Sequence, residues 1–351
     1  MTANSHNYSK ILLAWYDQNG RDLPWRNTRD PYKIWLSEII LQQTRVDQGM
    51  AYYFAFTDQF KTVKDLANAP QEAVLKTWQG LGYYSRARNL HATAQEIAFN
   101  RNGEFPKSAK ELKELKGVGP YTSAAIASIA FGEVIPVVDG NVYRWITRLF
   151  GIELPIDQKD GQKAVQEIVE AIIPHDRPAD FNQAMMDFGA TLCSQKKPNC
   201  EACPFKQYCI ATENQLTDIL PIKAKKTKVQ TVYLNYFVLE HKKQIIMKQR
   251  PDSGIWAGLN DFPLIESDQK IEETQLIDQA EAKFIFSEGK LLSVSPQMKH
   301  LLSHRKLLAQ FYWIQLHTPP EYLHEDHYWC AIEDLDKKPL PKLIENYWKT
   351  R

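Results

Sequence analysis

Hydrophobic positions in the first two thirds of the chain recur with the spacing of helices. Residues 31–46, PYKIWLSEIILQQTRV, begin with a helix-compatible proline and then carry apolar side chains on nearly every face, as a buried helix does. Residues 69–100 predict two helices interrupted by Gly80 and Gly82. Residues 108–132 predict two more helices around a tight glycine turn. We therefore expect a mainly α N-terminal part.

The pattern changes near residue 229. No convincing strand precedes Cys209, whereas three later runs rich in β-branched and aromatic side chains predict strands: residues 231–240, 244–250 and 310–316. A polar stretch with several lysines lies between the two patterns and is typical of a linker. The division that we expect is a helical region at residues 1–215, a basic linker at residues 216–229 and an α+β domain at residues 230–351.

Composition is compatible with this division. A chain of 351 residues with 44% hydrophobic and 24% charged residues is long enough for two domains with separate cores. No window approaches the run of about eighteen apolar residues that a membrane span needs, so we expect a cytoplasmic protein. The formal net charge of +1 excludes no class of function, because a nucleic-acid enzyme can balance a basic face with acidic surface elsewhere.

Four of the five cysteines lie in one lysine-containing loop: Cys193, Cys200, Cys203 and Cys209. Because glutathione keeps cytosolic thiols reduced, clustered cysteines there indicate metal ligands more than disulfides. The spacing C-x6-C-x2-C-x5-C has a single C-x2-C pair, whereas structural zinc sites usually have two pairs or a mixture with histidine. The spacing favours a [4Fe–4S] cluster, in which each iron takes one protein ligand. Zinc and a set of redox disulfides are the alternatives.

A glycine turn and an aspartate are candidates for chemistry. Gly117 and Gly119 allow a hairpin whose backbone N–H groups can approach a phosphate closely, and a turn without a ligand is the alternative. Asp139 follows an apolar run and precedes a predicted helix that begins at Gly140. Its carboxylate either caps that helix or is directed into a cleft by the helix start.

Glu38 is the second candidate carboxyl group. It lies in the middle of the nearly apolar helix IWLSEIIL, where an ionised side chain is costly unless it is paired or functional. Burial raises the pKa of such a group, and a glutamic acid that keeps its proton near neutral pH can act as a general acid beside an ionised carboxylate. A structural salt bridge to an arginine is the alternative.

Six motifs together resemble the endonuclease III superfamily of helix-hairpin-helix DNA glycosylases: LPWR, WLSEIILQQT, GLGYYSRARNL, GVGPYT, PVVDGNVYRW and the cysteine loop. Within it, the sequence is similar to the A/G-specific adenine DNA glycosylases, which remove adenine misincorporated opposite 8-oxoguanine. The resemblance covers nearly the whole chain. It implies a six-helix barrel and an iron–sulfur cluster domain, followed by a C-terminal α+β Nudix-like domain that recognises 8-oxoguanine.

The resemblance assigns catalytic roles to five residues. Glu38 would protonate adenine N7, and Asp139 would stabilise the oxocarbenium-like sugar. Tyr121 would lie against the site near the aspartate, which Asn141 would orient. Arg26 would support Glu38 or the extruded adenine. Bifunctional members carry a lysine where this chain has Tyr121, and tyrosine cannot form the Schiff base that strand scission needs, so a monofunctional glycosylase is expected.

The resemblance also assigns DNA contacts. Gln42, Gln43 and Tyr83 would fill the duplex where the adenine is flipped out. The hairpin residues Gly117, Val118 and Gly119 would hold a backbone phosphate, with a monovalent cation as a further ligand. The aromatic-Ser-His pattern of the family's 8-oxoguanine loop is matched here by Leu302, Ser303 and His304, so two of its three residues are present.

The expected partner is double-stranded DNA with A:8-oxoG or A:G mispairs, acted on by a monomer in the cytoplasm of a bacterial-type cell, at the nucleoid. Pyrophosphate hydrolysis is not expected, because the sequence lacks the glutamate-rich Nudix box. Two alternatives remain open. One is a glycosylase/lyase for oxidised pyrimidines, and the other is a non-catalytic DNA-binding protein that uses the hairpin and the cysteine loop as a scaffold.

Overall fold

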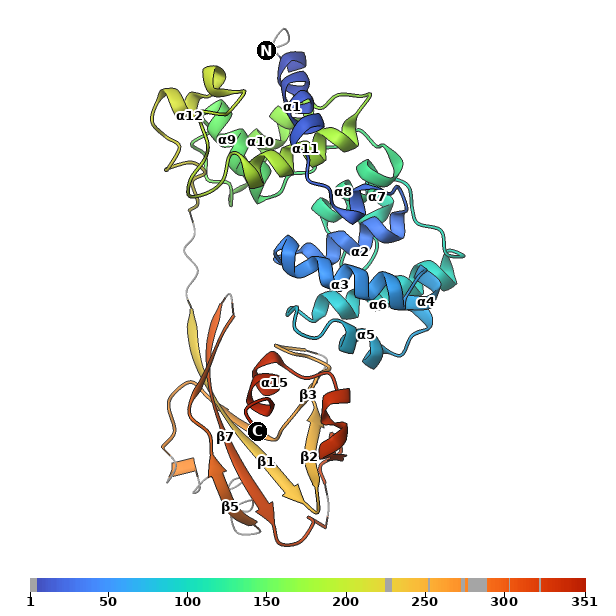
Figure 1. Ribbon diagram of the computed structural model, residues 1–351, viewed down its shortest axis with the longest axis vertical. Coiled ribbons are helices and arrows are strands. Elements are labelled where there is room, and N and C mark those ends of the chain that lie inside the picture. The colour runs from blue at the N-terminus through green and yellow to red at the C-terminus, as the bar shows by residue number, and fades with distance from the viewer. Residues whose placement is uncertain are drawn as a thin grey trace. The chain divides into compact units, whose positions relative to one another are not determined.

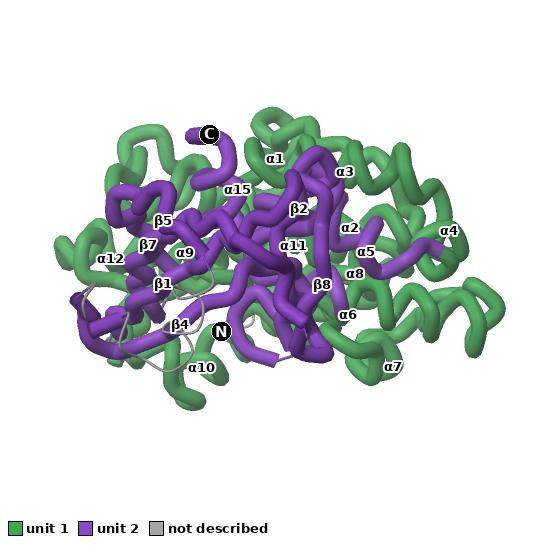
Figure 2. The backbone as a smooth tube through the Cα atoms, turned by 90° about the horizontal axis from the view of Figure 1, so that it is seen from below, with its two compact units in different colours: residues 1–68, 89–226 green, residues 69–88, 227–351 purple. Residues whose placement is uncertain are grey.

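The computed structural model describes most of the chain: residues 5–224, 229–251, 253–272, 275–276, 289–302, 304–321 and 323–351. The chain forms two compact units, coloured separately in Figure 2. Unit 1 contains residues 1–68 and 89–226, and unit 2 contains residues 69–88 and 227–351. None of the helices in the described part of the chain is both long and apolar enough to cross a membrane.

Unit 1 is built from helices, which Figure 1 colours from blue to yellow: α1 (Ser5–Asn19), η1 (Pro24–Arg26), α2 (Pro31–Leu41), α3 (Val46–Gln59), α4 (Val63–Asn68), α6 (Ser85–Gln95, shared with unit 2), η2 (Glu96–Asn100), α7 (Ala109–Leu112), α8 (Pro120–Phe131), α9 (Gly140–Phe150), α10 (Lys159–Ile172), α11 (Pro178–Thr191), η3 (Lys206–Tyr208) and α12 (Ile210–Glu213). Among the described residues, no strand precedes Gln230, as the sequence predicts.

Local sequence explains where the functional helices of unit 1 begin. Helix α2 starts at Pro31, whose fixed φ suits the first turn, and the Asp30 side chain accepts a hydrogen bond from Tyr32 N at 2.9 Å. Helix α8 also starts with a proline, directly after the hairpin glycine Gly119. Helix α9 is capped by Asp139, so one expected structural role of this residue is present.

A core of large apolar side chains joins the helices that follow the hairpin. Helix α11 packs against both α1 and α9, and Figure 1 shows α1 beside α11. The core residues include Trp145, Phe181, Phe188 and Phe205, all at most 2% exposed. Burial of aromatic side chains of this size contributes strongly to stability, and it fixes α9 and α11 relative to each other.

Unit 2 contains one mixed sheet with strands in the order β3-β2-β1-β7-β5. Its elements are α5 (Gln71–Thr77), β1 (Gln230–His241), β2 (Gln244–Gln249), β3 (Asn260–Asp261), β4 (Leu264–Ser267), β5 (Gly289–Val294), β6 (Met298–Leu301), β7 (Arg305–Leu316), β8 (His327–Ala331), η4 (Ile332–Lys337) and α15 (Lys342–Trp348). Strands β1 and β7 pair in parallel, and the other pairs are antiparallel. The strands expected at residues 231–240 and 310–316 lie within β1 and β7, and the one expected at residues 244–250 extends one residue beyond β2.

Both faces of the central strands are covered, which explains their nearly continuous apolar sequences. Neighbouring residues of a strand face opposite sides, so Tyr236 and Phe237 contribute to different layers. Tyr236 stacks on Phe311 with ring centroids 4.8 Å apart, and Phe311 stacks on Tyr347 of α15 at 3.9 Å. Phe237 packs in a second core with Tyr312 on the other face.

The compact units differ from the expected division at one point. Residues 69–88, expected within the helical region, group with the C-terminal part of the chain. Polar contacts account for this grouping, because the Lys76 ammonium donates to the carbonyl oxygens of Asp336 and Lys338, and Lys338 Nζ lies 3.1 Å from Glu72 Oε1. A periodicity analysis cannot foresee contacts between segments that are far apart in sequence.

Candidate active site

Glu38 occupies α2 and has an unusual electrostatic environment. Burial, together with the nearby charge of Asp139, raises the pKa of Glu38 to about 7. A hydrogen bond from the Tyr121 side chain and the charge of Arg26 oppose this rise only in part. Within the described residues Glu38 forms no salt bridge, so the ion-pair alternative that the sequence left open is not observed. Near neutral pH this carboxyl group is therefore able both to hold and to release a proton.

Asp139 is held as the N-cap of α9 by three donors. Its Oδ1 accepts hydrogen bonds from the backbone N–H groups of Asn141 and Val142, both at 2.8 Å, and its Oδ2 accepts one from Asn141 Nδ2 at 2.7 Å. Burial raises the pKa of Asp139, and these hydrogen bonds oppose the rise because they favour the ionised form. The carboxylate thus caps the helix and lies within electrostatic range of Glu38 at the same time.

The segment before Asp139 is fixed by an asparagine that the sequence analysis did not identify. Asn182, on α11, is fully buried, and its Oδ1 accepts from Val137 N at 3.0 Å. Its Nδ2 donates to Ser128 Oγ and to Ile135 O, both at 2.9 Å. A polar residue within the apolar stretch of α11 was the available signal, because a buried amide needs partners. Asn182 therefore sets the path of the chain into the site.

Tyr121, the second residue of α8, reaches the same site. Burial raises the pKa of Tyr121, and the neighbouring charges of Glu38 and Asp139 raise it further. The phenol therefore stays protonated and can donate to the Glu38 carboxylate, the stronger of its two acceptors. The other is Met186 Sδ, at 3.1 Å from the hydroxyl oxygen.

Arg26 is held by an aspartate rather than by Glu38 directly. Its Nη2 donates to Asp187 Oδ1 at 2.6 Å, and Arg21 donates to the same carboxylate through its Nε at 2.8 Å. Burial alone would raise the pKa of the fully buried Asp187, but the hydrogen bonds from both arginines bring it below its ordinary value. Arg26 acts on Glu38 through its charge, which lowers the pKa of Glu38. Asp187 was not foreseen.

Arg144 links the start of α9 to the cysteine loop. Its Nη2 donates to Asn141 Oδ1 at 2.8 Å, its Nε donates to Cys193 O at 2.8 Å, and the guanidinium also donates to Gly189 O. Gly189 lets α11 approach closely, because a Cβ at this position would lie 2.4 Å from Asn141 O. Asn141, which donates to Asp139, is thus itself held by Arg144 on one side and by the close approach of α11 at Gly189 on the other.

The hairpin before α8 has the backbone that the sequence predicts. Gly117 has φ +79°, and a Cβ there would lie 2.7 Å from Asn89 Cβ, so glycine is required for two reasons. Gly119 precedes the twelve-residue helix α8, has open space around it, and is exposed. Val118, between them, is buried. The exposed backbone next to a helix N-terminus is suited to bind an anion.

The residues expected to contact the DNA stack lie in different units. Gln42 Nε2 donates to Thr122 Oγ1 at 3.2 Å, and the next residue, Gln43, is exposed with φ +54°. Tyr83, in unit 2, is exposed with φ +48°, and the Arg86 guanidinium lies 5.6 Å from its ring centroid. A positive φ is uncommon for residues other than glycine and is often found at functional sites.

Of the expected 8-oxoguanine loop, two residues can be placed. Leu302 and His304 lie between β6 and β7, where Leu302 N donates to Arg305 O at 2.8 Å. His304 is exposed, and its carbonyl oxygen accepts from Gln230 N at 3.1 Å. Ser303 lies outside the described residues. Trp256 and Trp313, elsewhere in unit 2, are buried.

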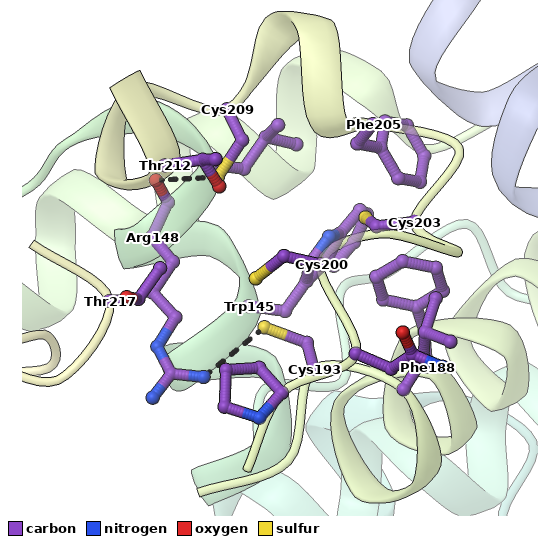
Figure 3. A pocket seen from close by; sticks show the side chains of 14 residues that line it. Trp145, Arg148, Phe188, Cys193, Cys200, Cys203, Phe205, Cys209, Thr212 and Thr217 are labelled. Atoms are coloured by element: carbon purple, nitrogen blue, oxygen red, sulfur yellow. Dashed lines mark hydrogen bonds between the residues drawn. The ribbon is translucent and has the colours of Figure 1, made fainter. Parts of the chain in front are cut away.

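The four clustered cysteines line one pocket with Trp145 and Arg148 (Figure 3). All five cysteines lie in the described part of the chain, and all are free thiols. Arg148 Nη1 donates to Cys193 Sγ at 3.5 Å, and Cys209 Sγ contacts Arg148 O at 3.5 Å. Both interactions are drawn in Figure 3.

The sulfur spacing differs from that of a single-metal site. Tetrahedral zinc holds its sulfur ligands at about 2.3 Å, which places neighbouring sulfurs about 3.8 Å apart. In the described part of the chain, the only group of three or more histidine, cysteine or acidic ligand atoms within 4.8 Å of one another is His324, Asp326 and His327, in unit 2. The cysteine sulfurs form no such group, so no three of them lie as close to one another as a single zinc ion would hold them.

Comparisons with known proteins agree with this architecture. A family model for HhH-GPD superfamily base excision DNA repair proteins matches residues 36–174, and a NUDIX domain model matches residues 235–350. The adenine DNA glycosylase of Buchnera aphidicola subsp. Acyrthosiphon pisum is 33% identical, over 97% of this chain and 98% of its own. The adenine DNA glycosylase of Homo sapiens is 32% identical, over 92% of this chain and 70% of its own.

A solved structure of a thermostable thymine-DNA glycosylase superposes with a TM-score of 0.56 and 32% identity, covering 60% of this chain and 97% of that one. The predicted fold class, a helical helix-hairpin-helix part followed by a Nudix-like domain with a mixed sheet, is confirmed.

Proposed function

Because this chain belongs to the adenine DNA glycosylase family of the helix-hairpin-helix superfamily, and is therefore a DNA N-glycosylase, we propose that it excises adenine paired with 8-oxoguanine or guanine in duplex DNA. The observation that carries the proposal is the pairing of two carboxyl groups in different environments. Glu38 has a pKa raised to about 7, and Asp139 is held by three hydrogen bonds that favour its anion.

Glu38 is the proposed general acid. A carboxyl group with a pKa near 7 is partly protonated at neutral pH and still acidic enough to transfer its proton in the transition state. Protonation of adenine N7 makes the base a neutral leaving group and weakens its bond to C1′. The Tyr121 hydroxyl stabilises the carboxylate that remains, since it hydrogen-bonds Glu38 and stays protonated itself.

Asp139 is the proposed stabiliser of the positive charge that develops on the sugar. Its anion is fixed at the start of α9 by Asn141 and Val142, so it need not reorganise as the charge appears. Asn141 is held in turn by Arg144. Arg26, anchored on Asp187, keeps the pKa of Glu38 from rising further. Water completes the hydrolysis.

We propose a monofunctional enzyme. A lyase needs an amine that attacks C1′ to form a Schiff base, and the side chain that reaches the two carboxyl groups from the hairpin helix is the phenol of Tyr121. The product is therefore an abasic site in an intact strand. Any oxidised-pyrimidine glycosylase/lyase activity would need a different amine.

The proposed DNA contacts follow the exposed backbone features. The Gly117–Gly119 hairpin binds a phosphate, directly or through a monovalent cation, while Gln42, Gln43 and Tyr83 occupy the space left by the flipped adenine. His304 and Ser303 contact the opposite 8-oxoguanine. Leu302 provides an apolar contact there, but it lacks the ring face that an aromatic side chain would offer for stacking.

The cysteine pocket is proposed to hold a [4Fe–4S] cluster, ligated by Cys193, Cys200, Cys203 and Cys209. Two observations support the fit. The sulfurs are spread more widely than a zinc ion would hold them, and the buried indole N–H of Trp145 has no hydrogen-bond partner among the described residues. When bound, the cluster cross-links the loop of residues 193–209. Arg144, which donates to Cys193 O and Asn141 Oδ1, connects that loop to the carboxylate site.

The function is tested with end-labelled duplexes, each treated with and without hot alkali. The arms are adenine opposite 8-oxoguanine, adenine opposite guanine, thymine opposite guanine and an oxidised pyrimidine opposite guanine. We expect alkali-dependent breaks at adenine in the first two arms only. The thymine arm is included because the helical part resembles a thymine-DNA glycosylase. Breaks at thymine, or alkali-independent breaks at the pyrimidine, would contradict the proposal.

A further inference from the structure

Trp145 lines the cysteine pocket and carries a buried hydrogen-bond donor that is unpaired in the described part of the chain. It lies on α9, is 2% exposed, and lines the pocket together with all four clustered cysteines. Its Nε1 is buried and makes no hydrogen bond within the described part of the chain. Figure 3 shows Trp145 among the side chains of Cys193, Cys200 and Cys203. A buried indole N–H usually has a partner, because its desolvation is otherwise uncompensated.

The indole is held firmly in this position. Its ring packs against Phe188, with centroids 5.3 Å apart, and against Phe205, with centroids 5.4 Å apart. Phe188 and Phe205 also contact each other at 5.3 Å. All three rings are nearly inaccessible to solvent, so a rotation of the indole toward water would break this packing. The partner of the N–H is therefore expected inside the pocket.

Sulfur dominates the acceptors that line this pocket. Its lining is mostly apolar apart from the thiols, Asn199, Arg148 and two threonines. Arg148 already donates to Cys193 Sγ from the other side. Cluster sulfides and ligating thiolates carry negative charge and accept hydrogen bonds from N–H groups. The Arg148 guanidinium is thus directed at sulfur, and the Trp145 N–H is without an acceptor among the described residues.

We propose that Trp145 Nε1–H donates a hydrogen bond to a sulfur of the [4Fe–4S] cluster and thereby raises the reduction potential of the cluster. The inference rests on the proposed cofactor. Reduction adds one electron to the cluster without forming or breaking a covalent bond, and it increases the negative charge on the sulfurs. A donor to sulfur therefore stabilises the reduced state more than the oxidised state. Trp145 thus tunes the cofactor through a direct hydrogen bond.

Trp145→Phe removes the N–H and keeps an aromatic ring. We expect purified, cluster-loaded Trp145→Phe protein to have a more negative reduction potential than the wild type in film voltammetry. Trp15→Phe is the matched control. Trp15 packs on the same core, with its ring 4.9 Å from that of Phe188, and it does not line the pocket. Its substitution should leave the potential unchanged. Equal potentials in Trp145→Phe and wild type would overturn the inference.

A second pair of measurements separates the hydrogen bond from packing. Replacement of Trp145 by 3-benzothienylalanine keeps the two-ring shape and substitutes sulfur for the N–H. It therefore tests the hydrogen bond even if Trp145→Phe folds poorly. We expect this variant to show the same negative shift in potential. In wild-type protein, exchange into D2O should shift the iron–sulfur stretching bands in resonance Raman spectra, and this response should be smaller in the variant. An unchanged potential in this variant would overturn the inference, and so would an isotope response equal to that of the wild type.

Failure of the inference is distinguishable from failure of the proposed cofactor. Iron and sulfide analysis of wild-type protein tests the cofactor by itself, since zinc or an absence of iron would refute the cluster whatever Trp145 does. If iron and sulfide are present at four each per chain, as a [4Fe–4S] cluster requires, only the potential and the isotope response bear on Trp145.

Discussion

At the scale of single residues, the two carboxyl groups of the site differ in the number of donors they receive. Asp139 accepts three hydrogen bonds from the start of α9, whereas among the described residues the hydrogen bond to Glu38 comes from the Tyr121 side chain. Hydrogen bonds to a carboxylate favour its ionised form, and burial without them favours the acid. The local chemistry therefore favours the anion more strongly at Asp139 than at Glu38.

The raised pKa of Glu38 predicts a pH-dependent gain in stability for Glu38→Gln. Between pH 4.5 and about 7 the folded protein keeps a proton on Glu38 that the unfolded chain loses, so wild-type stability falls as pH rises through this window. Glu38→Gln has no titrating group at this position, so its stability does not fall in this way. Its free energy of unfolding should exceed that of wild type by up to about 3 kcal/mol at about pH 8, and the gain should disappear toward about pH 5.

Denaturant unfolding at the two pH values measures this difference. The control is Glu167→Gln, which removes the same charge from an exposed position on α10 and should change stability little at either pH. Base excision by Glu38→Gln should be lost in the same preparation. A variant that is less stable than wild type at both pH values would show that Glu38 is a structural ion in the folded protein.

Leu302 predicts incomplete discrimination between lesion and undamaged guanine. In place of an aromatic ring, this position carries an aliphatic side chain that cannot stack through a π face. Leu302→Phe should therefore increase the ratio of excision rates for adenine opposite 8-oxoguanine and adenine opposite guanine by at least about fivefold, the equivalent of about 1 kcal/mol. Single-turnover rates on the two duplexes measure the ratio, and an unchanged ratio would remove this position from lesion recognition.

At the scale of elements, the position of Asp139 depends on how closely α9 and α11 approach. Gly189→Ala would place a Cβ 2.4 Å from Asn141 O and 2.8 Å from Asn141 Cβ, so the start of α9 must move. Overpacking of this kind costs about 1–3 kcal/mol, and a displacement of about 1 Å at a catalytic group can cost about a hundredfold in rate. We expect lower thermal stability and at least a tenfold slower excision by this variant.

Gly140→Ala is the control for this prediction. It adds the same methyl group in the first turn of α9, where no heavy atom lies within 4 Å, so stability should not fall. Thermal unfolding compares the two variants, and single-turnover excision tests Gly189→Ala. Wild-type behaviour of Gly189→Ala would mean that the close approach of the two helices does not hold the site.

The sequence pattern was sufficient for most elements, and it singled out the two carboxyl groups that the structure brings within electrostatic range of each other. Proline and glycine positions bound α2 and α8. The isolated charge of Glu38 in an apolar helix indicates a poorly solvated carboxyl group, and in the structure Glu38 is half-buried with a raised pKa. Helix periodicity reports only which face of a helix is buried. It could not indicate that Asn182 and Asp187, both fully buried on α11, would hold the segment before Asp139 and the Arg26 guanidinium.

At the scale of the whole molecule, residues 69–88 belong to the same compact unit as the Nudix-like sheet. The Arg88 guanidinium donates to Ala257 O, and Tyr84 OH lies 3.4 Å from Leu340 O. Lys76 Nζ lies 2.9 Å from Gln79 Oε1 and also donates to carbonyl oxygens of the C-terminal segment. Tyr83, proposed to fill the stack, and His304, proposed to contact the lesion, are therefore carried by one unit. A structural change near Tyr83 should therefore also affect the part of unit 2 that carries His304.

Lys76→Met tests that connection in the full-length protein. Burial lowers the pKa of the Lys76 ammonium, which is nevertheless held by the carbonyl oxygens of Asp336 and Lys338. Loss of hydrogen bonds from a charged donor costs about 1.5–3 kcal/mol, so local opening should become at least about tenfold more frequent. Hydrogen–deuterium exchange should accelerate in residues 69–88 and in residues 332–340 together.

Lys163→Met is the control, because Lys163 is exposed and lies in unit 1. This substitution should leave the exchange rates of both segments unchanged. Acceleration confined to residues 69–88 would show that this segment opens independently, and Tyr83 would then not be coupled to the lesion-contacting loop through unit 2.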